Sequence, residues 1–556
     1  MFKNNLEYIN NEALKKRLLE ISDYESKSGI SYCMSESNDY VLLKDDIPID
    51  DLHDPREAIR KNFETNIRRN MKPNDIIVVF GIGLCYILDE AFTRYQSRIY
   101  LYEPDINLLH FVLSNVDISE ILKSGRVYIT NNLDDLADKI GSTYLTQDKV
   151  EVVYLQNYAV VRNKDILMLT QRVYDACKSK IVDVNTIAKF SKRWLKNSLN
   201  NIANINNLTA YLLSDLENRF IGQTALIAGA GPSLNDNIAN IQANRDKFII
   251  FAVNKSVKYL QKNGITPDFV VCLDAGNMDS TLDVPDTYLS RINCIADMRT
   301  DSSIFNKAFN KIFINFSDTD ILVQKLSKYN DFIKVIESGG TAAILGLVAA
   351  VKLGFSKILF AGIDLAFKDN VIYSDGRMIE RVSPEEIVVD NVRKSVVQIK
   401  SVSGGFVNTR SDYAAFVHHF ATVLKELNYT EVYNLSSFGA DIPGVKPIKF
   451  DELRLINSAS KQAINVAEPF KIEFRKFMQE EFFEINKIIS LLSRGAFSPA
   501  LVSAIVKSAL VYQYMQADVL DVLQKNFEQQ IADDFINETK AAIKTIVETL
   551  QKNKLI

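Results

Sequence analysis

The chain has 556 residues and a mass of 62.9 kDa. This is about three to four times the length of a typical domain, so we expect two or three domains rather than one core. Apolar residues make up 47% and charged residues 24%, proportions that exclude wholesale disorder. Because 65 basic residues nearly cancel 69 acidic ones, the formal net charge is -4, and nucleic acid is not an expected partner.

The distribution of cysteines and apolar residues predicts a cellular compartment. The five cysteines are scattered, without a CxxC spacing or matched histidine pairs that would indicate a zinc site. The N-terminal sequence lacks the continuous apolar segment of a signal peptide, and no run of 18 uncharged apolar residues occurs. We therefore expect a cytoplasmic protein with no membrane span and no bound metal.

Residues 1–162 are predicted to form an N-terminal Rossmann-like α/β domain. Short apolar runs alternate there with helical segments, which indicates a parallel sheet covered on both faces. The first run leads into Gly81 and Gly83, and Glu103 ends the next, as in nucleotide-binding turns. Tyr86 replaces the third glycine of that motif. The turn could bind a ligand, or it could be a plain tight turn with Glu103 as a solvated cap, and we assign it no function.

The remaining chain divides into three predicted parts. Residues 163–220 favour long helices and are predicted to form a helical connector. Seven apolar runs, separated by helical or turn-rich segments, predict a second Rossmann-like α/β domain over 221–450. Residues 451–556 are amphipathic and almost lack glycine, which predicts a helical C-terminal domain. The expected fold is α/β, with two parallel-sheet domains followed by an α-helical domain.

A glycine-rich turn, GAGPSL, directly follows the first apolar run of the central domain. Gly229 and Gly231 permit a close ligand approach, Pro232 presets φ, and Ser233 can cap the next helix. This pattern predicts an anion site of free backbone N–H groups, suited to the phosphate of a sugar nucleotide. The lysine-containing Walker sequence is absent, which argues against an NTPase.

Polar residues also end other strands of this domain. Asn254 and Asp274 end the second and third apolar runs, where the crevice of an open parallel sheet forms, although each could instead be a cap or turn residue. Asp364 ends an otherwise apolar strand and must reach the rim or a partner. A helix start nearby is a second candidate ligand contact, or tight helix–sheet packing. It consists of Ser338, Gly339, Gly340 and Thr341.

These segments, in this order, resemble the central domain of the motility associated factor (Maf) glycosyltransferases, which modify flagellin with nonulosonic acids. The resemblance rests on GAGPSLND, NKSVKYLQKNGITPDFVVCLD, SGGTAAILGLVAAVKLGFSKILFAGIDLAF and VYNLSSFGADIPGV. With the flanking domains it covers most of the chain. The same segments are similar to bacterial sialyltransferases that use CMP-sialic acid.

The resemblance implies transfer of a pseudaminic- or legionaminic-type sugar from its CMP form to Ser/Thr hydroxyls of flagellin, without a cofactor. It places the glycine turn at the donor phosphate and the cytidine ribose. The donor-binding residues that it implies are Gly229, Gly231, Pro232, Ser233, Asn254, Asp274, Ser338, Gly339, Gly340, Thr341 and Asp364.

The predicted catalytic base is where the chain departs from the sialyltransferases, which place a histidine just before the last helix–strand pair. Here the corresponding stretch offers Asp412 or Tyr413, and Asp412 is the predicted proton acceptor. His418 and His419 come later, in a helix with an apolar stripe, where they are predicted to pack or face solvent. The aromatic residue two positions after the strand-end aspartate is replaced by Ala366.

Two other functions remain open at this point. Archaeal enzymes that share the central domain transfer diphosphate from ATP to a hydroxymethylpterin, which would require Mg²⁺ on carboxylates such as Asp274 and Asp364. That function leaves the flanking domains unexplained. Alternatively, the chain is a non-catalytic flagellin-binding chaperone whose C-terminal helices dock an amphipathic helix.

Overall fold

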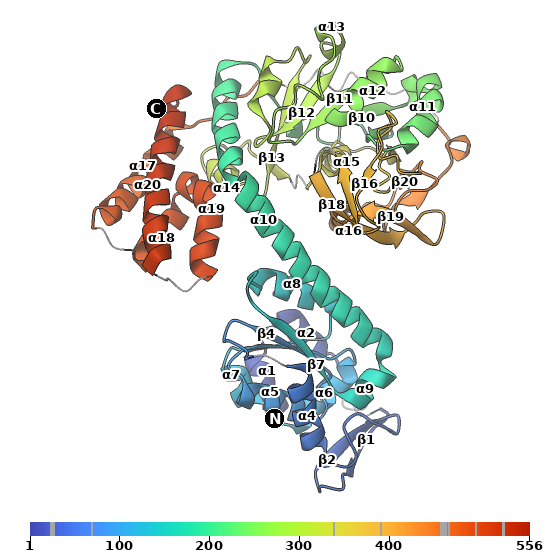
Figure 1. Ribbon diagram of the computed structural model, residues 1–556, viewed down its shortest axis with the longest axis vertical. Coiled ribbons are helices and arrows are strands. Elements are labelled where there is room, and N and C mark those ends of the chain that lie inside the picture. The colour runs from blue at the N-terminus through green and yellow to red at the C-terminus, as the bar shows by residue number, and fades with distance from the viewer. Residues whose placement is uncertain are drawn as a thin grey trace. The chain divides into compact units, whose positions relative to one another are not determined.

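The computed structural model describes residues 1–22, 28–67, 70–336, 340–389, 392–455, 464, 468–494, 497–524 and 529–556 (Figure 1). The chain forms two compact units, Met1–Thr186 and Ile187–Ile556. Each unit contains a parallel sheet with helices, and the C-terminal region is helical, so the predicted fold class is confirmed. Among the described residues, no helix combines the length and apolarity needed to span a bilayer.

The first unit is built on a four-stranded parallel sheet in the order β6-β5-β4-β7. Its strands are β4 (Ile76–Phe80), β5 (Arg98–Tyr102), β6 (Val127–Thr130) and β7 (Val150–Tyr154). They match the apolar runs predicted for residues 1–162. All of β4 is buried, which explains why its sequence lacks polar alternation.

The first unit also contains eight complete α-helices among its described residues and a small antiparallel sheet. Its helices are α1 (Phe2–Tyr8), α2 (Glu12–Leu19), α4 (Pro55–Asn66), α5 (Tyr86–Arg94), α6 (Ile106–Asn115), α7 (Ser119–Lys123), α8 (Leu133–Thr143) and α9 (Gln156–Val161). A small antiparallel sheet, which we did not predict, consists of β1 (Ile30–Met34), β2 (Tyr40–Lys44) and β3 (Ile47–Pro48).

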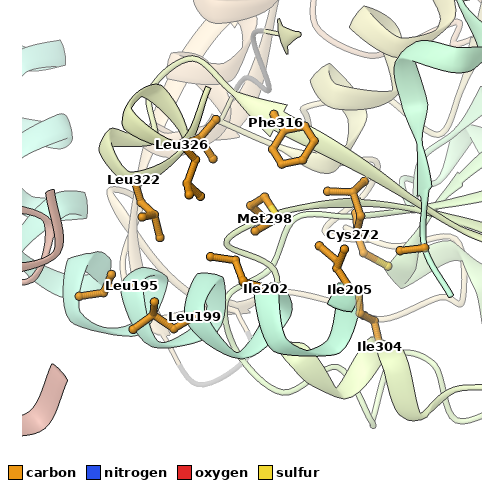
Figure 2. Close-up of a cluster of buried hydrophobic side chains, with 14 of the residues drawn as sticks. Leu195, Leu199, Ile202, Ile205, Cys272, Met298, Ile304, Phe316, Leu322 and Leu326 are labelled. Atoms are coloured by element: carbon orange, nitrogen blue, oxygen red, sulfur yellow. The ribbon is translucent and has the colours of Figure 1, made fainter. Parts of the chain in front are cut away.

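A single helix of 45 residues, α10 (Asn163–Asn207), forms most of the predicted connector. Leu169 and Val173 near its start belong to the core of the first unit. Near its end, the side chains of Leu195, Leu199 and Ile202 lie in the core of the second unit, on the side that faces Met298 and Phe316 (Figure 2). The helix therefore contributes apolar residues to both cores.

The second unit contains a parallel sheet in the order β14-β13-β12-β11-β10-β9-β15-β20-β21, with β8 paired to β13. Its strands are β8 (Tyr211–Leu212), β9 (Thr224–Ala228), β10 (Ile249–Val253), β11 (Phe269–Cys272), β12 (Asn293–Asp297), β13 (Ile312–Ser317), β14 (Val335–Ile336), β15 (Lys357–Ala361), β20 (Val432–Asn434) and β21 (Lys446–Pro447). All seven predicted runs are strands.

The strand order reverses between β9 and β15. The chain proceeds outward from β9 through β10, β11, β12 and β13, and then places β15 against the other side of β9. In open parallel sheets, the ligand crevice forms at such a switch point, outside the carboxyl ends of the strands. This geometry makes the residues that follow β9 and β15 the first place to look for a site.

Helices and a second, antiparallel sheet complete the central part of this unit. The helices are α11 (Ser233–Ala243), α12 (Val257–Lys262), α13 (Asp286–Leu289), α14 (Ile321–Leu326), α15 (Ala342–Lys352) and α16 (Ser411–Leu427). The antiparallel sheet, which we did not predict, lies between β15 and α16 in sequence. Its strands are β16 (Glu380–Arg381), β17 (Glu386–Val389), β18 (Val392–Lys400) and β19 (Phe406–Arg410).

The C-terminal helices belong to the same compact unit as the large sheet. They are α17 (Arg475–Leu492), α18 (Pro499–Lys507), α19 (Ala509–Gln524) and α20 (Gln529–Lys552). Their apolar side chains share one core with β9, β10, β11, β12 and β13. The predicted boundaries at residues 220 and 450 divide this unit in sequence and stay predictions.

Candidate functional site

Two glycine-containing turns meet at the switch point of the second unit. Gly229 N–H donates to the carbonyl of Ala361 at 2.8 Å, and Gly231 N–H donates to the carbonyl of Gly362 at 2.8 Å. A Cβ atom on Gly229 would lie 2.2 Å from the carbonyl oxygen of Gly362. These glycines are therefore required because the two strand ends approach so closely.

Ser233 and Asp364 join the same two turns. Ser233 N–H donates to Oδ2 of Asp364 at 2.8 Å, and Gly362 N–H donates to Oγ of Ser233 at 2.9 Å. Pro232 is the N-cap of α11, and the Ser233 side chain caps nothing. The prediction that Ser233 caps the helix is therefore wrong.

The predicted cradle of free N–H groups is also wrong for this turn. The N–H groups of Gly229, Gly231 and Ser233 all donate to acceptors within the protein. The carboxylate of Asp364 takes the position that we assigned to a ligand anion, and it is buried. Burial raises the pKa of Asp364, and its hydrogen bonds with Ser233 lower it only in part.

The two predicted strand-end residues Asn254 and Asp274 do come together. Asn254 Nδ2 donates to Oδ2 of Asp274 at 2.8 Å and lies 3.4 Å from Oγ1 of Thr281. Asn254 is buried whereas Asp274 is exposed. The amide holds one carboxylate oxygen, and the exposed side of the pair remains open to a ligand.

The predicted helix start before α15 is described in part. Ser338 and Gly339 lie outside the described residues. Thr341 is the N-cap of α15, and its Oγ1 accepts the N–H of Ile344 at 3.2 Å. A Cβ on Gly340 would lie 3.4 Å from Nδ1 of His419, so this half-buried histidine from α16 lies beside the helix start.

Lys255 and Tyr373 form a pair beside the glycine turn that sequence reasoning missed. Lys255 follows Asn254 directly, and its Nζ donates to the hydroxyl of Tyr373 at 3.3 Å. Lys255 is exposed and Tyr373 is buried. Ser374 N–H donates to the carbonyl of Ala230 at 2.8 Å, which fixes this segment to the glycine turn. The site thus contains a cation next to a phenol hydroxyl.

Only one member of this pair carried a signal in the sequence. Lys255 adjoins a strand-end asparagine, so its place at the carboxyl edge could have been inferred. Tyr373 belongs to the irregular segment after β15, and its position depends on contacts with Ala230 that no periodicity predicts.

Asp412, the predicted base, is held by two cations. Arg410 Nε donates to its Oδ1 at 2.8 Å, and Lys394 Nζ lies 3.1 Å from its Oδ2. Burial by itself would raise the pKa of Asp412, but Arg410 and Lys394 outweigh it and bring the pKa below its ordinary value. An ionised, weakly basic carboxylate is a poor proton acceptor, and its catalytic role stays a prediction.

A buried ionic network lies further along the carboxyl edge of the same sheet. Arg299 Nε donates to Oδ1 of Asp297 at 3.0 Å, and its Nη2 donates to Oγ of Ser317 at 3.0 Å. Its Nη1 lies 3.2 Å from Oγ1 of Thr319. The guanidinium also lies 5.1 Å from the ring centroid of Trp194 on α10. This network joins the ends of β12 and β13 to that helix.

In the first unit, the glycine turn after β4 is filled by the protein's own side chains. Glu103 accepts the N–H of Ile82 at 3.0 Å and the hydroxyl of Tyr158 at 2.6 Å, and it is fully buried. The description of Glu103 as a solvated cap is therefore wrong. A Cβ on Gly83 would lie 2.8 Å from Oδ1 of Asp50.

Both carboxyl groups at this turn carry a raised pKa. The side chain of Asp50 is buried, with 4% of the residue exposed. Burial raises the pKa of Asp50 to about 7, and the nearby backbone of Leu42 and Leu84 lowers it only in part. Burial likewise raises the pKa of Glu103 to about 7 against the hydrogen bond from Tyr158.

We expect Asp50→Asn to stabilise the first unit at pH 8. The folded pKa of Asp50 exceeds its unfolded value, so its contribution to stability is present at pH 4 and is lost as pH rises toward 7. The variant should gain on the order of 2–4 kcal/mol at pH 8 and little at pH 4. Urea unfolding at both pH values checks this. Asp46→Asn, at an exposed position, is the control, and an equal gain from it would contradict the explanation.

Three comparisons with known proteins bear on this site. A family described as "6-hydroxymethylpterin diphosphokinase MptE-like" matches residues 196–370. An uncharacterized protein of Treponema pallidum (strain Nichols) is 27% identical over 165 residues, which cover 29% of this chain and 77% of that protein.

A solved structure extends the similarity to both units. It is a Maf glycosyltransferase from Magnetospirillum magneticum AMB-1, with a TM-score of 0.63 and 16% identity, and the match covers 98% of this chain and 96% of that one. The resemblance to the Maf glycosyltransferases is therefore confirmed at the level of the fold, which this chain shares over nearly its whole length.

Proposed function

We propose that this chain is a glycosyltransferase that moves a nonulosonic acid, of the pseudaminic or legionaminic type, from its CMP form to Ser/Thr hydroxyls of flagellin. The observation that carries the proposal is the exposed cation Lys255 beside Tyr373 at the switch point, in a chain with the Maf fold from end to end. The fold similarity supports the transferase class. The donor and the acceptor are inferred from the sequence resemblance, and a cytoplasmic location is inferred from the scattered cysteines and the apolar pattern of the sequence.

The donor phosphate is assigned to Lys255 and Tyr373. Because the N–H groups of Gly229, Gly231 and Ser233 are already used, a phosphate bound here needs another source of positive charge, and Lys255 is an exposed cation next to that turn. The Asn254–Asp274 pair is assigned to the ribose or the sugar. Asn254 directly precedes Lys255, and Asp274 follows the next strand of the chain, β11. The two glycines shape the turn and do not bind the phosphate themselves.

The proposed reaction replaces one bond at the anomeric carbon of the sugar. The acceptor hydroxyl oxygen forms a bond to that carbon, and the bond from the carbon to the phosphate oxygen breaks with its electron pair, releasing CMP. Lys255 stabilises the charge that develops on the phosphate. The hydroxyl proton passes to a base, for which Asp412 is the predicted residue. His419 is a second candidate, because its Nδ1 would lie 3.4 Å from a Cβ on Gly340, beside the start of α15.

Lys255→Met is expected to weaken CMP binding by roughly tenfold to hundredfold, because it removes a charge-assisted contact to the phosphate. Calorimetric titration of the full chain with CMP measures this. Lys258→Met is the matched control: Lys258 lies one turn later and pairs with Asp283 at 3.0 Å. Equal CMP affinity in the Lys255 variant and the wild type would contradict the assignment of the phosphate to Lys255.

A diphosphokinase is the second candidate function, favoured by the family match over residues 196–370. In that reaction Mg²⁺ would be bound by carboxylates such as Asp274 and Asp364, yet Asp364 already accepts a hydrogen bond from the N–H of Ser233. The two functions differ in ligand and in metal dependence. We expect CMP, and not ATP with Mg²⁺, to raise the thermal unfolding temperature, because only a ligand of the folded state stabilises it.

The corresponding activity test uses flagellin and a CMP-nonulosonate donor. Sugar transfer should persist in excess EDTA, since the proposed stabilisation of the phosphate comes from Lys255. Loss of transfer in EDTA, together with stabilisation by ATP and Mg²⁺, would favour the diphosphokinase. Binding of CMP without any transfer would favour the chaperone function.

A further inference from the structure

A cavity of about 560 Å³ opens in the second unit, beside the loop that follows β11. One wall is the part of α10 that carries Lys192, Arg193 and Lys196. The loop after β11, at Ala275–Asn277, forms another. Helices α19 and α20 close it with Tyr514 and with other side chains. Its volume is typical of a small-molecule site rather than of a protein interface.

The charge in this cavity is mostly positive. Lys196 lies four residues after Lys192 and three after Arg193, so it neighbours both on the surface of α10, and all three cations are exposed and line the cavity. The cavity lining contains one carboxylate, Asp301. Asp301 is already engaged, since its Oδ1 accepts the N–H of Ser303 at 3.0 Å.

Two of the three cations form no ion pair with the residues that the structure describes. Lys192 pairs with Glu538 at 3.3 Å and lies 5.1 Å from the ring centroid of Tyr514. Arg193 and Lys196 form no ion pair with any carboxylate in the described parts of the chain. Arg193 lies against the opposite wall, because a Cβ on Gly276 would be 3.5 Å from its Nη1. Two unpaired cations thus face into a concave site.

We propose that this cavity binds a small anionic ligand that carries two or more ionised groups, either phosphates or carboxylates. Arg193 and Lys196 supply charge-assisted hydrogen bonds to those groups, and a guanidinium suits the two oxygens of a phosphate or carboxylate. Two ionised groups match the two unpaired cations. The inference does not depend on the proposed function, because neither Arg193 nor Lys196 belongs to the switch-point site.

The ligand would act as a link between separate parts of the unit. The cavity is built from α10, the β11 loop and the C-terminal helices. Its wall is also joined to Asp274, because Asp301 N–H donates to the carbonyl of Asp274 at 3.0 Å. Such a site exists only when these elements are folded together, so binding raises the thermal stability of the unit.

The test is calorimetric titration of the full chain in 0.15 M NaCl with pyrophosphate, with citrate and with neutral N-acetylglucosamine. The double variant Arg193→Glu/Lys196→Glu reverses the two unpaired charges. Lys476→Glu/Lys487→Glu makes the same change in net charge on the exposed face of α17, and is the matched control. Lys255→Met reports binding at the switch point. If the double reversal fails to fold, Arg193→Gln/Lys196→Gln takes its place.

We expect at least one of the two anions to bind the wild type with 1:1 stoichiometry and the neutral sugar not to bind. The dissociation constant should rise at least tenfold in the cavity variant and stay within about twofold in the α17 and Lys255 variants. Binding of pyrophosphate alone identifies a phosphate ligand, and binding of citrate alone a carboxylate ligand. Absence of binding by both, equal binding in the cavity variant, or loss in Lys255→Met overturns the proposal. These outcomes do not decide the proposed function, which is tested separately by titration with CMP.

Discussion

Gly229→Ala should lower the free energy of unfolding of the second unit by about 3 kcal/mol or more. Its new Cβ would lie 2.2 Å from the carbonyl oxygen of Gly362 and 2.4 Å from Cδ1 of Ile363. The first of these atoms is backbone at the end of a buried strand, so relief of the clash would require separating β9 from β15. Denaturant unfolding followed by circular dichroism measures the change.

Gly346→Ala is the matched control for that experiment. Gly346 lies inside α15, and a Cβ there would come no closer than 3.6 Å to Ile227. Alanine in a helix interior is favoured over glycine by up to about 1 kcal/mol, so this variant should be as stable as the wild type or more so. Equal effects of the two substitutions would contradict the role assigned to Gly229.

The role of Gly231 changes for the same reason. A Cβ on Gly231 would lie 2.3 Å from Oδ2 of Asp364. A larger residue there would disturb the protein itself, so loss of CMP binding in Gly231→Val would report on folding and not on a ligand contact.

Arg299→Leu is expected to cost about 3–5 kcal/mol of the stability of the second unit. Removal of the guanidinium leaves the carboxylate of Asp297, which is 0% exposed, without its cation. Ser317 and Thr319 lose a donor at the same time. Urea unfolding at pH 7 compares this variant with Lys258→Met, which breaks an exposed pair and should cost under about 1 kcal/mol.

A second substitution separates charge from packing in this network. If the cost arises from the uncompensated Asp297, then Arg299→Leu/Asp297→Asn should recover a large part of it, because the buried group becomes neutral. No recovery in the double variant would assign the cost to the lost contact with Trp194 and the hydroxyl groups instead.

The strands were predictable because they are buried on both faces. Parallel strands such as β4 and β9 form continuous apolar runs bounded by glycine, and these runs need no knowledge of the partner strand. The antiparallel sheet from β16 to β19 has mixed exposure, with polar and apolar positions that do not separate cleanly, and its strands carry no such signal. Its contribution to the site, through Lys394 and Arg410 beside Asp412, was therefore not foreseen.

The site residues divide in the same way. Asn254, Asp274 and Asp364 were located correctly at strand ends because position in a parallel sheet follows from the strand alone. The sequence does not indicate which acceptors the backbone N–H groups of the turn bind. The hydrogen bond from Ser233 N–H to Asp364 depends on the approach of two turns that are 131 residues apart in the chain. Lys255 with Tyr373 is a pairing of the same long-range kind.

Helix α10 contains a segment at which two related chains can be joined without dividing either hydrophobic core. Of the side chains described between residues 174 and 190, none is buried, whereas Leu195, Leu199 and Ile202 belong to the core that the large sheet shares with the C-terminal helices. Ala176 and Cys177 still pack against the core of the first unit, so a crossover within the codons for 178–190 would exchange one complete core for another. A crossover in the loop after α10 would separate the sheet from part of its own core. Natural or engineered chimaeras should therefore be joined inside the helix, at a place where sequence alone would not put a domain boundary.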